Sequence, residues 1–437
     1  MAVVLRSPRV RRILAGFTIN RLGSFFGLIA LLVLVYDQTG SGLAVAGLLL
    51  AWQALPAFTV PPLVARAEAS VHGRELTGLY LFEAVATGLL AFFASHFWLP
   101  VVLLLAWLDG TAALAASALL RAALARAARE EAEHEPAAEA PGDAEGAANA
   151  AVNVAFSSTF VLGPALGGVL VAAIGASATL IVDVASFVVC GALLADLRTH
   201  VSEAAGDSVR ARLIAARDYV RSRARLRTIL IVYAGALALF EAAAPIEVAF
   251  AKSTLLSGDR GLGLLLTAWG GGAVVGSLVF ARLTRRPLAP LLSLGTLAIG
   301  LADLGFALSP GLGIACIAAV VGGLGNGIEL PAIMGLVQQL SPGEMHGRLM
   351  GAVESLTALS LAVGLLIGGA LLAALTVRVS FAVVAAATIA TAVALFLLTG
   401  SPEEPVEPAA PARRGDGAAP EPRIGPAAPD GAPLNDR

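Results

Sequence analysis

The apolar stretch GPALGGVL, Gly163–Leu170, returns in the second half of the chain as GLLIGGAL, Gly364–Leu371. The two stretches lie 201 residues apart and place three glycines in the same register. A second pair, GLLL at Gly47–Leu50 and again at Gly263–Leu266, lies 216 residues apart. The matches follow the same order along the chain, so together they predict two related halves.

The two offsets differ by fifteen residues, which predicts an insertion in the first half. The acidic segment 130–145, EEAEHEPAAEAPGDAE, is the natural place for it. Its content of Glu, Ala and Pro indicates a flexible loop.

The amino-acid composition indicates that the two halves fold in a membrane rather than in water. Of 437 residues, 57% are hydrophobic and 14% are charged, against about 45–50% and about 25% in soluble domains. An ordinary soluble enzyme is therefore excluded. At about 20 residues per membrane crossing, we predict an all-α membrane protein with twelve transmembrane helices in two six-helix pseudo-repeats. The expected spans are 13–36, 43–63, 76–95, 99–120, 151–174, 178–197, 228–250, 262–281, 288–308, 311–336, 349–375 and 378–399.

Arginine and lysine predict the orientation of this bundle. With both termini inside, 25 of the 29 basic residues fall on the inner side. Only Lys252, Arg260 and Arg378 fall in outer loops, and Arg21 lies within the first span. The positive-inside rule therefore predicts cytoplasmic termini.

Polar segments divide the chain further. We predict a first half at 1–200 and a second half at 228–400, joined by the basic segment 201–227. That segment reads either as an amphipathic helix on an anionic leaflet or as a plain basic linker. The proline-rich tail 401–437 has almost no large apolar side chains, so we expect it to be disordered.

Several stretches resemble the major facilitator superfamily, and more closely its bacterial macrolide-efflux and enterobactin-exporter branch. The resemblance covers about residues 10–400 and implies a multi-pass protein of a bacterial inner membrane. It also implies that Gly163 and Pro164 belong to the antiporter motif of the family. The matching residues are Asn20–Ser24, Tyr36–Pro56, Gly163–Phe187, Leu324–Gly327, Gln338, Pro342, Gly347 and Arg348.

One motif departs from the family pattern. The family loop between spans 2 and 3 usually reads G-x-x-x-D-R-x-G-R-R, and its aspartate helps to lock the cytoplasmic side. Here Arg66 matches the arginine, but Ala65 replaces the aspartate. The second copy has Ala281 at that position and keeps three arginines, Arg282, Arg285 and Arg286. The resemblance therefore does not extend to the aspartate that helps to close the cytoplasmic side in the family.

Ionisable residues inside the spans are the candidate functional residues, because a charge at the centre of a bilayer costs at least about 2.5–3.5 kcal/mol. In the family, spans 1, 4, 7 and 10 line the central cavity. This criterion selects Arg21, Asp109, Glu241, Glu247 and Glu329, with Asn326 beside the last. Loss of water favours the protonated form of a carboxylate, as a proton-coupled antiporter needs. The alternative for each residue is a structural charge pair or a place at the water interface.

We therefore expect a secondary transporter that couples protons to the efflux of amphipathic small molecules by alternating access. The substrates would be drug-like, macrolide-like or siderophore-like, bound in an apolar cavity with a carboxylate for cationic groups. The alternative is a transport-inactive binding or sensor protein on the same fold. The sequence offers no nucleophile–base pair, P-loop or metal spacing, so we expect no enzyme activity, no metal and no cofactor beyond a proton gradient. The expected partners are the small-molecule substrate and the lipid bilayer, without nucleic acid, and the expected state is a monomer.

Overall fold

The computed structural model describes residues 7–60, 75–134, 141–196, 217–283, 286–340 and 346–399. The helices of the first half are α1 (Pro8–Thr39), α2 (Gly42–Leu49) with the π-helical turn η2 (Leu50–Ala54), α4 (Glu75–Phe93), α5 (Leu99–His134), α6 (Pro141–Ile174) and α7 (Ala176–Leu193). Those of the second half are α9 (Ala224–Ala249) with the π-helical turn η3 (Phe250–Thr254), α10 (Gly258–Arg282), α11 (Leu288–Leu308), α12 (Leu312–Gln339), α13 (His346–Ala374) and α14 (Val377–Thr399).

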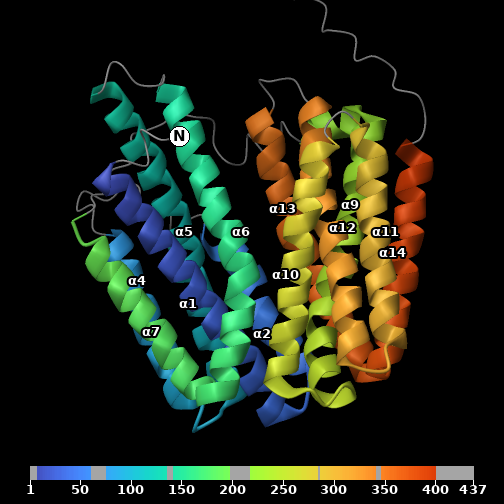
Figure 1. Ribbon diagram of the computed structural model, residues 1–437, viewed down its shortest axis with the longest axis horizontal. Coiled ribbons are helices and arrows are strands. Elements are labelled where there is room, and N and C mark those ends of the chain that lie inside the picture. The colour runs from blue at the N-terminus through green and yellow to red at the C-terminus, as the bar shows by residue number, and fades with distance from the viewer. Residues whose placement is uncertain are drawn as a thin grey trace, which may run out of the picture. The chain divides into compact units, whose positions relative to one another are not determined.

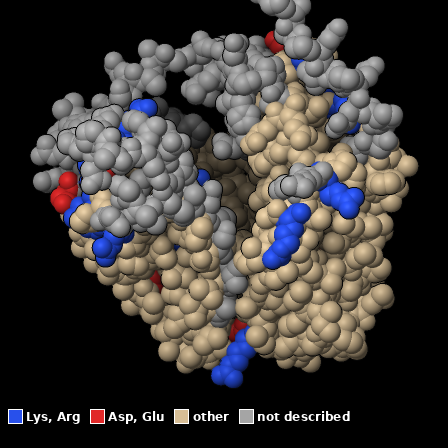
Figure 2. All heavy atoms as spheres, turned by 45° about the horizontal axis from the view of Figure 1, so that its top comes forward, with Lys and Arg blue, Asp and Glu red and all other residues tan. Residues whose placement is uncertain are grey.

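The predicted all-α membrane architecture is confirmed. Eleven helices in the described ranges are long and apolar enough to cross a membrane. The apolar part of α6, Ser158–Ile174, is the shorter twelfth. Large apolar side chains such as Phe58, Val85 and Ile231 are exposed on the outside of the bundle, and most of the described surface is uncharged (Figure 2). Such a surface suits lipid rather than water.

Two helices extend beyond the predicted spans. The acidic segment 130–145, expected to be a loop, is helical at both ends, because α5 continues to His134 and α6 begins at Pro141. Ala, Arg and Glu are strong helix formers, so this part of the chain stays helical beyond the apolar run. Arg9 donates to Glu130 over 2.5 Å and the Ser7 hydroxyl to Glu131 over 2.6 Å, which ties the end of α5 to the start of α1.

The predicted linker and tail lie largely outside the described residues. Of the linker 201–227, the structure describes only the last eleven residues, which include the start of α9. The tail 401–437 lies entirely outside the described part of the chain. The boundaries that we expected between halves, linker and tail therefore stay predictions.

The two groups of six helices meet at one end. Here the C-terminal part of α1, the start of α2 and the turn η3 share one apolar core, with Val33, Leu48 and Phe250 all buried in it. Across this contact α10 packs along α6, and α13 packs along α2 (Figure 1). Phe250, Phe306 and Phe381 form an aromatic cluster in the same core, with ring centroids 5.1–5.9 Å apart.

Two facing glycines allow the closest approach in this contact. A Cβ on Gly168 of α6 would lie 2.7 Å from the Cα of Gly263 of α10, closer than real Cβ contacts. Close packing of this kind is the main source of helix association in a bilayer, where lipid is as apolar as the side chains. These two glycines belong to the repeated stretches from which the two halves were predicted.

We predict that Gly168→Ala lowers the midpoint of thermal unfolding of the purified protein by several degrees, because the new methyl group meets backbone that cannot move aside. Gly271→Ala on α10 is the matched control, since its Cβ would meet nothing within 4 Å. Alanine is intrinsically the better helix former, so the control should unfold at the wild-type temperature or above it. Equal midpoints for the two variants would contradict the proposed packing.

Candidate functional site

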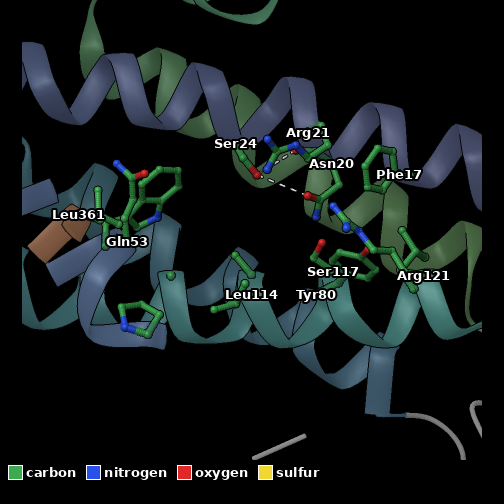
Figure 3. A pocket seen from close by; sticks show the side chains of 15 residues that line it. Phe17, Asn20, Arg21, Ser24, Gln53, Tyr80, Leu114, Ser117, Arg121 and Leu361 are labelled. Carbon is green, nitrogen blue, oxygen red and sulfur yellow. Dashed lines mark hydrogen bonds between the residues drawn. The ribbon is translucent and has the colours of Figure 1, made fainter. Parts of the chain in front are cut away.

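A cavity of about 300 Å³ lies within the first half, between α1 and α5 (Figure 3). Because two arginines line it, we call it the arginine cavity. Leu361 of α13 is its contact with the second half. Its lining residues are Phe17, Asn20, Arg21, Ser24, Trp52, Gln53, Pro56, Tyr80, Gly110, Ala113, Leu114, Ser117, Leu120, Arg121 and Leu361.

Helix periodicity explains this lining. On α1, Phe17, Arg21 and Ser24 recur at spacings of three and four, which places them on one face. On α5, Leu114, Ser117 and Arg121 recur in the same way. Each helix therefore brings one guanidinium group to the space between them.

The turn η2 adds a third wall. A π-helical turn shifts the direction of the side chains that follow it and often marks a functional site. Here η2 carries Trp52 and Gln53, both in the lining. Gly110 of α5 leaves no room for a Cβ beside the carbonyl oxygen of Trp52, so η2 and α5 pack closely.

The polar groups of the cavity are all neutral or positive. Its described lining holds two arginines and no Asp or Glu. Neutral donors and acceptors come from Asn20, Ser24, Gln53 and Ser117. The Ser24 hydroxyl donates to the Asn20 carbonyl oxygen over 2.9 Å (Figure 3), and the Arg21 guanidinium lies 5.2 Å from the centre of the Phe25 ring.

Asp109, although it is next to Gly110 in sequence, is not part of this lining. Its carboxylate accepts hydrogen bonds from Trp52 Nε1 and from the Thr87 hydroxyl, each over 3.0 Å. It lines a smaller pocket beside the arginine cavity, together with Asp183. Arg21 therefore lines the arginine cavity, whereas Asp109 lies in the adjacent smaller pocket.

The carboxylates of the second half lie apart from one another. Glu329 is buried between α11 and α12, where the Thr296 hydroxyl donates to it over 2.6 Å. Glu241 is half-buried where α9 faces Gly364 of α13. Asn326 is half-buried on α12, which runs without a break past Pro331.

Glu247 lines a second cavity, of about 160 Å³, between the two halves. This cavity, called the interface cavity below, is walled by Phe25 and Pro164 from the first half and by Trp269 from the second. The Oε1 atom of Glu247 is buried and has no hydrogen-bond partner among the described residues. Of the four predicted carboxylates, Glu247 is the one that reaches a cavity shared by both halves.

The remaining predicted residues belong to motifs. Gly163 packs against the Phe25 ring, where a Cβ would overlap it, and α6 continues through Pro164. Arg282 and Arg286 are exposed at and after the end of α10. Arg66 and Arg285 lie outside the described residues.

An ionic bridge between the halves was not predicted. Lys252 of η3, the only lysine in the sequence, donates to Asp37 at the end of α1 over 2.8 Å and also pairs with Asp259 of α10. The side chain of Lys252 is 11% exposed. The sequence feature that could have drawn attention to Lys252 is that it is the single lysine in a chain with 28 arginines.

The sequence also did not predict that Arg121 lies in the same cavity as Arg21, because the place of Arg121 at the inner end of its span indicated an anchor at the membrane interface. Among the described residues, no group of three or more His, Cys, Asp or Glu side chains is arranged to hold a metal ion.

Comparison with known proteins supports the resemblance seen in the sequence. The family model of the Major Facilitator Superfamily matches residues 230–429. The multidrug efflux pump Tap of Mycobacterium tuberculosis is 29% identical over 270 residues, which cover 60% of this chain. Tap of Mycobacterium bovis gives the same figures. The match spans 63% of the length of these relatives.

Solved structures share the fold at low sequence identity. The nucleoside transporter NupG has a TM-score of 0.69 at 12% identity, covering 91% of this chain and all of that chain. A bacterial homologue of the human lysosomal transporter Spinster, in an inward-facing conformation, has a TM-score of 0.63 at 12% identity, covering 90% of this chain and 96% of that chain. The human organic anion transporter MFSD10 has a TM-score of 0.56 at 18% identity, covering 89% of this chain and all of that chain.

Two six-helix halves, with cavities inside the bundle and at the contact between the halves, are the architecture of membrane transporters built from repeats. The second half of the chain resembles the major facilitator superfamily, whose model matches residues 230–429. The chain is an all-helical, multi-pass membrane protein, and the proteins that it resembles are transporters. The closer resemblance to the macrolide-efflux and enterobactin-exporter branch stays a prediction.

Proposed function

We propose that this protein is a secondary transporter that exports amphipathic small molecules from a bacterial cell by alternating access, using the proton gradient. The observation that carries the proposal is that, among the described residues, the contacts between the two halves gather toward one end of the bundle. A carrier of this kind works by opening and closing its two ends in turn around a central site. The printed name of the Tap relatives, a multidrug efflux pump, favours efflux of drug-like molecules.

Contacts at the two ends of the bundle differ in kind. At the end where α1 finishes, the shared apolar core, the glycine pair and the Lys252 bridge join the halves. At the other end, Arg12 donates to Asp196 within the first half, and the Tyr219 hydroxyl to the Leu340 carbonyl within the second. A hollow lies between the two groups of helices in Figure 2. These observations favour a state that is closed at one end and open at the other.

The distribution of basic residues assigns these ends to the two sides of the membrane. With 25 basic residues on the side of the termini, the positive-inside rule places that side in the cytoplasm. We infer an inward-open carrier of the inner membrane, acting as a monomer, that takes its substrate from the cytoplasm. The outer end is then the one held by Lys252.

We infer that Glu247 carries the coupled proton. Its carboxyl group lies in the interface cavity, has a buried oxygen without a hydrogen-bond partner among the described residues, and faces aromatic and apolar side chains. Ionisation there is costly, so the inward-open state favours the protonated group. Movement of the halves would separate the walls of the interface cavity, and water that entered would allow the proton to leave. Glu329, in contrast, is held by Thr296 inside the second half.

We predict that Glu247→Gln abolishes the concentrating step and leaves passive exchange. In everted membrane vesicles, respiration should drive uptake of a panel of lipophilic dyes by the wild type, and a protonophore should collapse it. The Glu247→Gln variant should lose at least about 90% of gradient-driven uptake and retain dye-for-dye exchange. Glu329→Gln is the matched control, and its coupling should survive.

Two outcomes would count against this assignment. Wild-type coupling in Glu247→Gln would remove Glu247 from the proton path. Binding of dyes without any flux by the reconstituted wild type would select the transport-inactive alternative.

We also predict that Lys252→Met shifts the carrier toward states in which the outer end is open, because Asp37 and Asp259 then repel each other without a cation between them. Spin labels on cysteines at Ala178 and Leu308, exposed positions near that end in the two halves, report the opening when Cys190 and Cys316 are replaced by alanine. The longer-distance population should grow about two- to tenfold. Arg260→Met, an exposed cation on α10, is the control and should leave the distribution unchanged. An identical distribution in Lys252→Met would show that the bridge has no part in closing the outer end.

A further inference from the structure

We propose that the arginine cavity binds organic anions, with the carboxylate or sulfonate of the ligand held between Arg21 and Arg121. This inference rests on the proposed transport function and names its substrate class. It replaces the expectation of a carboxylate that receives cationic groups.

The geometry brings two guanidinium groups to one small space. Arg21 comes from α1 and Arg121 from α5, and both line the same cavity of about 300 Å³. Figure 3 shows the two side chains extending into the space between these helices. The planar guanidinium group donates two parallel hydrogen bonds to a carboxylate, so a pair of them suits an oxyanion better than any neutral group.

The charge of the lining has one sign. The carboxylates nearest in the fold, Asp109 and Asp183, line the adjacent smaller pocket instead. Asp109 accepts from Trp52 and Thr87, and Asp183 accepts from Ser186 over 3.2 Å. Glu83 is fully buried on α4 and is not in the lining. These buried acids offset part of the positive charge of the region, and Arg21 and Arg121 are the charged side chains of the described lining.

The rest of the lining indicates what the anionic group is attached to. Phe17, Leu114 and Leu361 offer apolar surface, and Trp52 offers an aromatic one. Neutral polar groups from Asn20 and Ser117 stand beside the arginines. A cavity at the lower end of the range for small-molecule sites, about 300–1,000 Å³, fits a compact amphipathic acid. The site as a whole is selective for a charged head on an apolar body.

The test compares ligands of matched shape and opposite charge. Titration calorimetry on the full-length purified protein would use benzoate, 1-naphthylacetate and 9-anthracenecarboxylate, against benzylammonium, 1-naphthylethylammonium and 9-anthracenylmethylammonium. The wild type should bind at least one acid about tenfold or more tightly than its matched amine. Arg21→Gln and Arg121→Gln should each weaken that acid about ten- to a hundredfold, the loss expected for one charge-assisted hydrogen-bonded contact.

Controls separate a lost ligand contact from a lost fold. Arg260→Gln, far along the chain on α10, removes one positive charge outside the lining and should bind as the wild type does. Arg21→Lys and Arg121→Lys keep the charge but lose the planar fork, so their affinity should fall between wild type and Gln. Monodisperse elution and an unchanged unfolding midpoint identify the variants whose binding can be compared.

Three results would overturn the inference: equal or stronger binding of the amines, absence of binding by every acid, or wild-type affinity in both Gln variants. Its failure is distinguishable from failure of the proposed function. Vesicles that export cationic dyes while the arginine variants stay fully active would keep the transporter and remove the anion site.

Discussion

The apolar core shared by the two halves at the C-terminal ends of α1 and α9 is the contact on which the other features depend. Lipid is as apolar as these side chains, so helix association here relies on close fit rather than on exclusion from water. The approach of Gly168 to Gly263 and the aromatic cluster around Phe250 provide that fit. Among the described residues this fit lies at one end of the bundle, which in the proposed transport cycle would let the halves diverge at the other.

The bilayer also separates the ionisable side chains into two kinds. Glu329 and Asp109 are each bonded by uncharged donors on neighbouring helices, so their placement serves the packing of a single half. Glu247, Arg21 and Arg121 reach cavities instead. A charged group that faces a cavity stays costly until water or a ligand solvates it. In the proposed transport cycle, these residues are therefore where movement of the halves would change the free energy most.

The sequence predicts the positions of the helices well but predicts poorly which side chains meet between helices, for a physical reason. Hydropathy detects apolar runs long enough to cross the membrane, so it located the spans. It missed the helical extension of α5 to His134, because that extension lies in a charged segment. The cost of buried charge, together with the family resemblance, selected Arg21 and Glu247 as candidates, and both line cavities in the structure. Only tertiary packing could show that Thr296 holds Glu329, or that Arg121 shares a cavity with Arg21. Neither pair has a fixed spacing in sequence, because each joins helices whose relative rotation no local pattern determines.

In the proposed carrier, the loop motif and the Lys252 bridge would favour the same conformational state. Ala65 and Ala281 occupy the positions of the aspartates that help to close the cytoplasmic side in the family that the sequence resembles. At the opposite end of the bundle, Lys252 joins the two halves through its ion pair with Asp37. In the proposed carrier both features would favour the inward-open state, so the free energy for closing the inner end would have to come from elsewhere. A ligand can shift such an equilibrium only by binding the closed state more tightly. The arginine cavity is suited to this, because its lining already includes Leu361 of the second half. An anion held by Arg21 and Arg121, with its apolar body against Leu361, gains contact as the halves approach, and that gain is what would move the carrier to its next state.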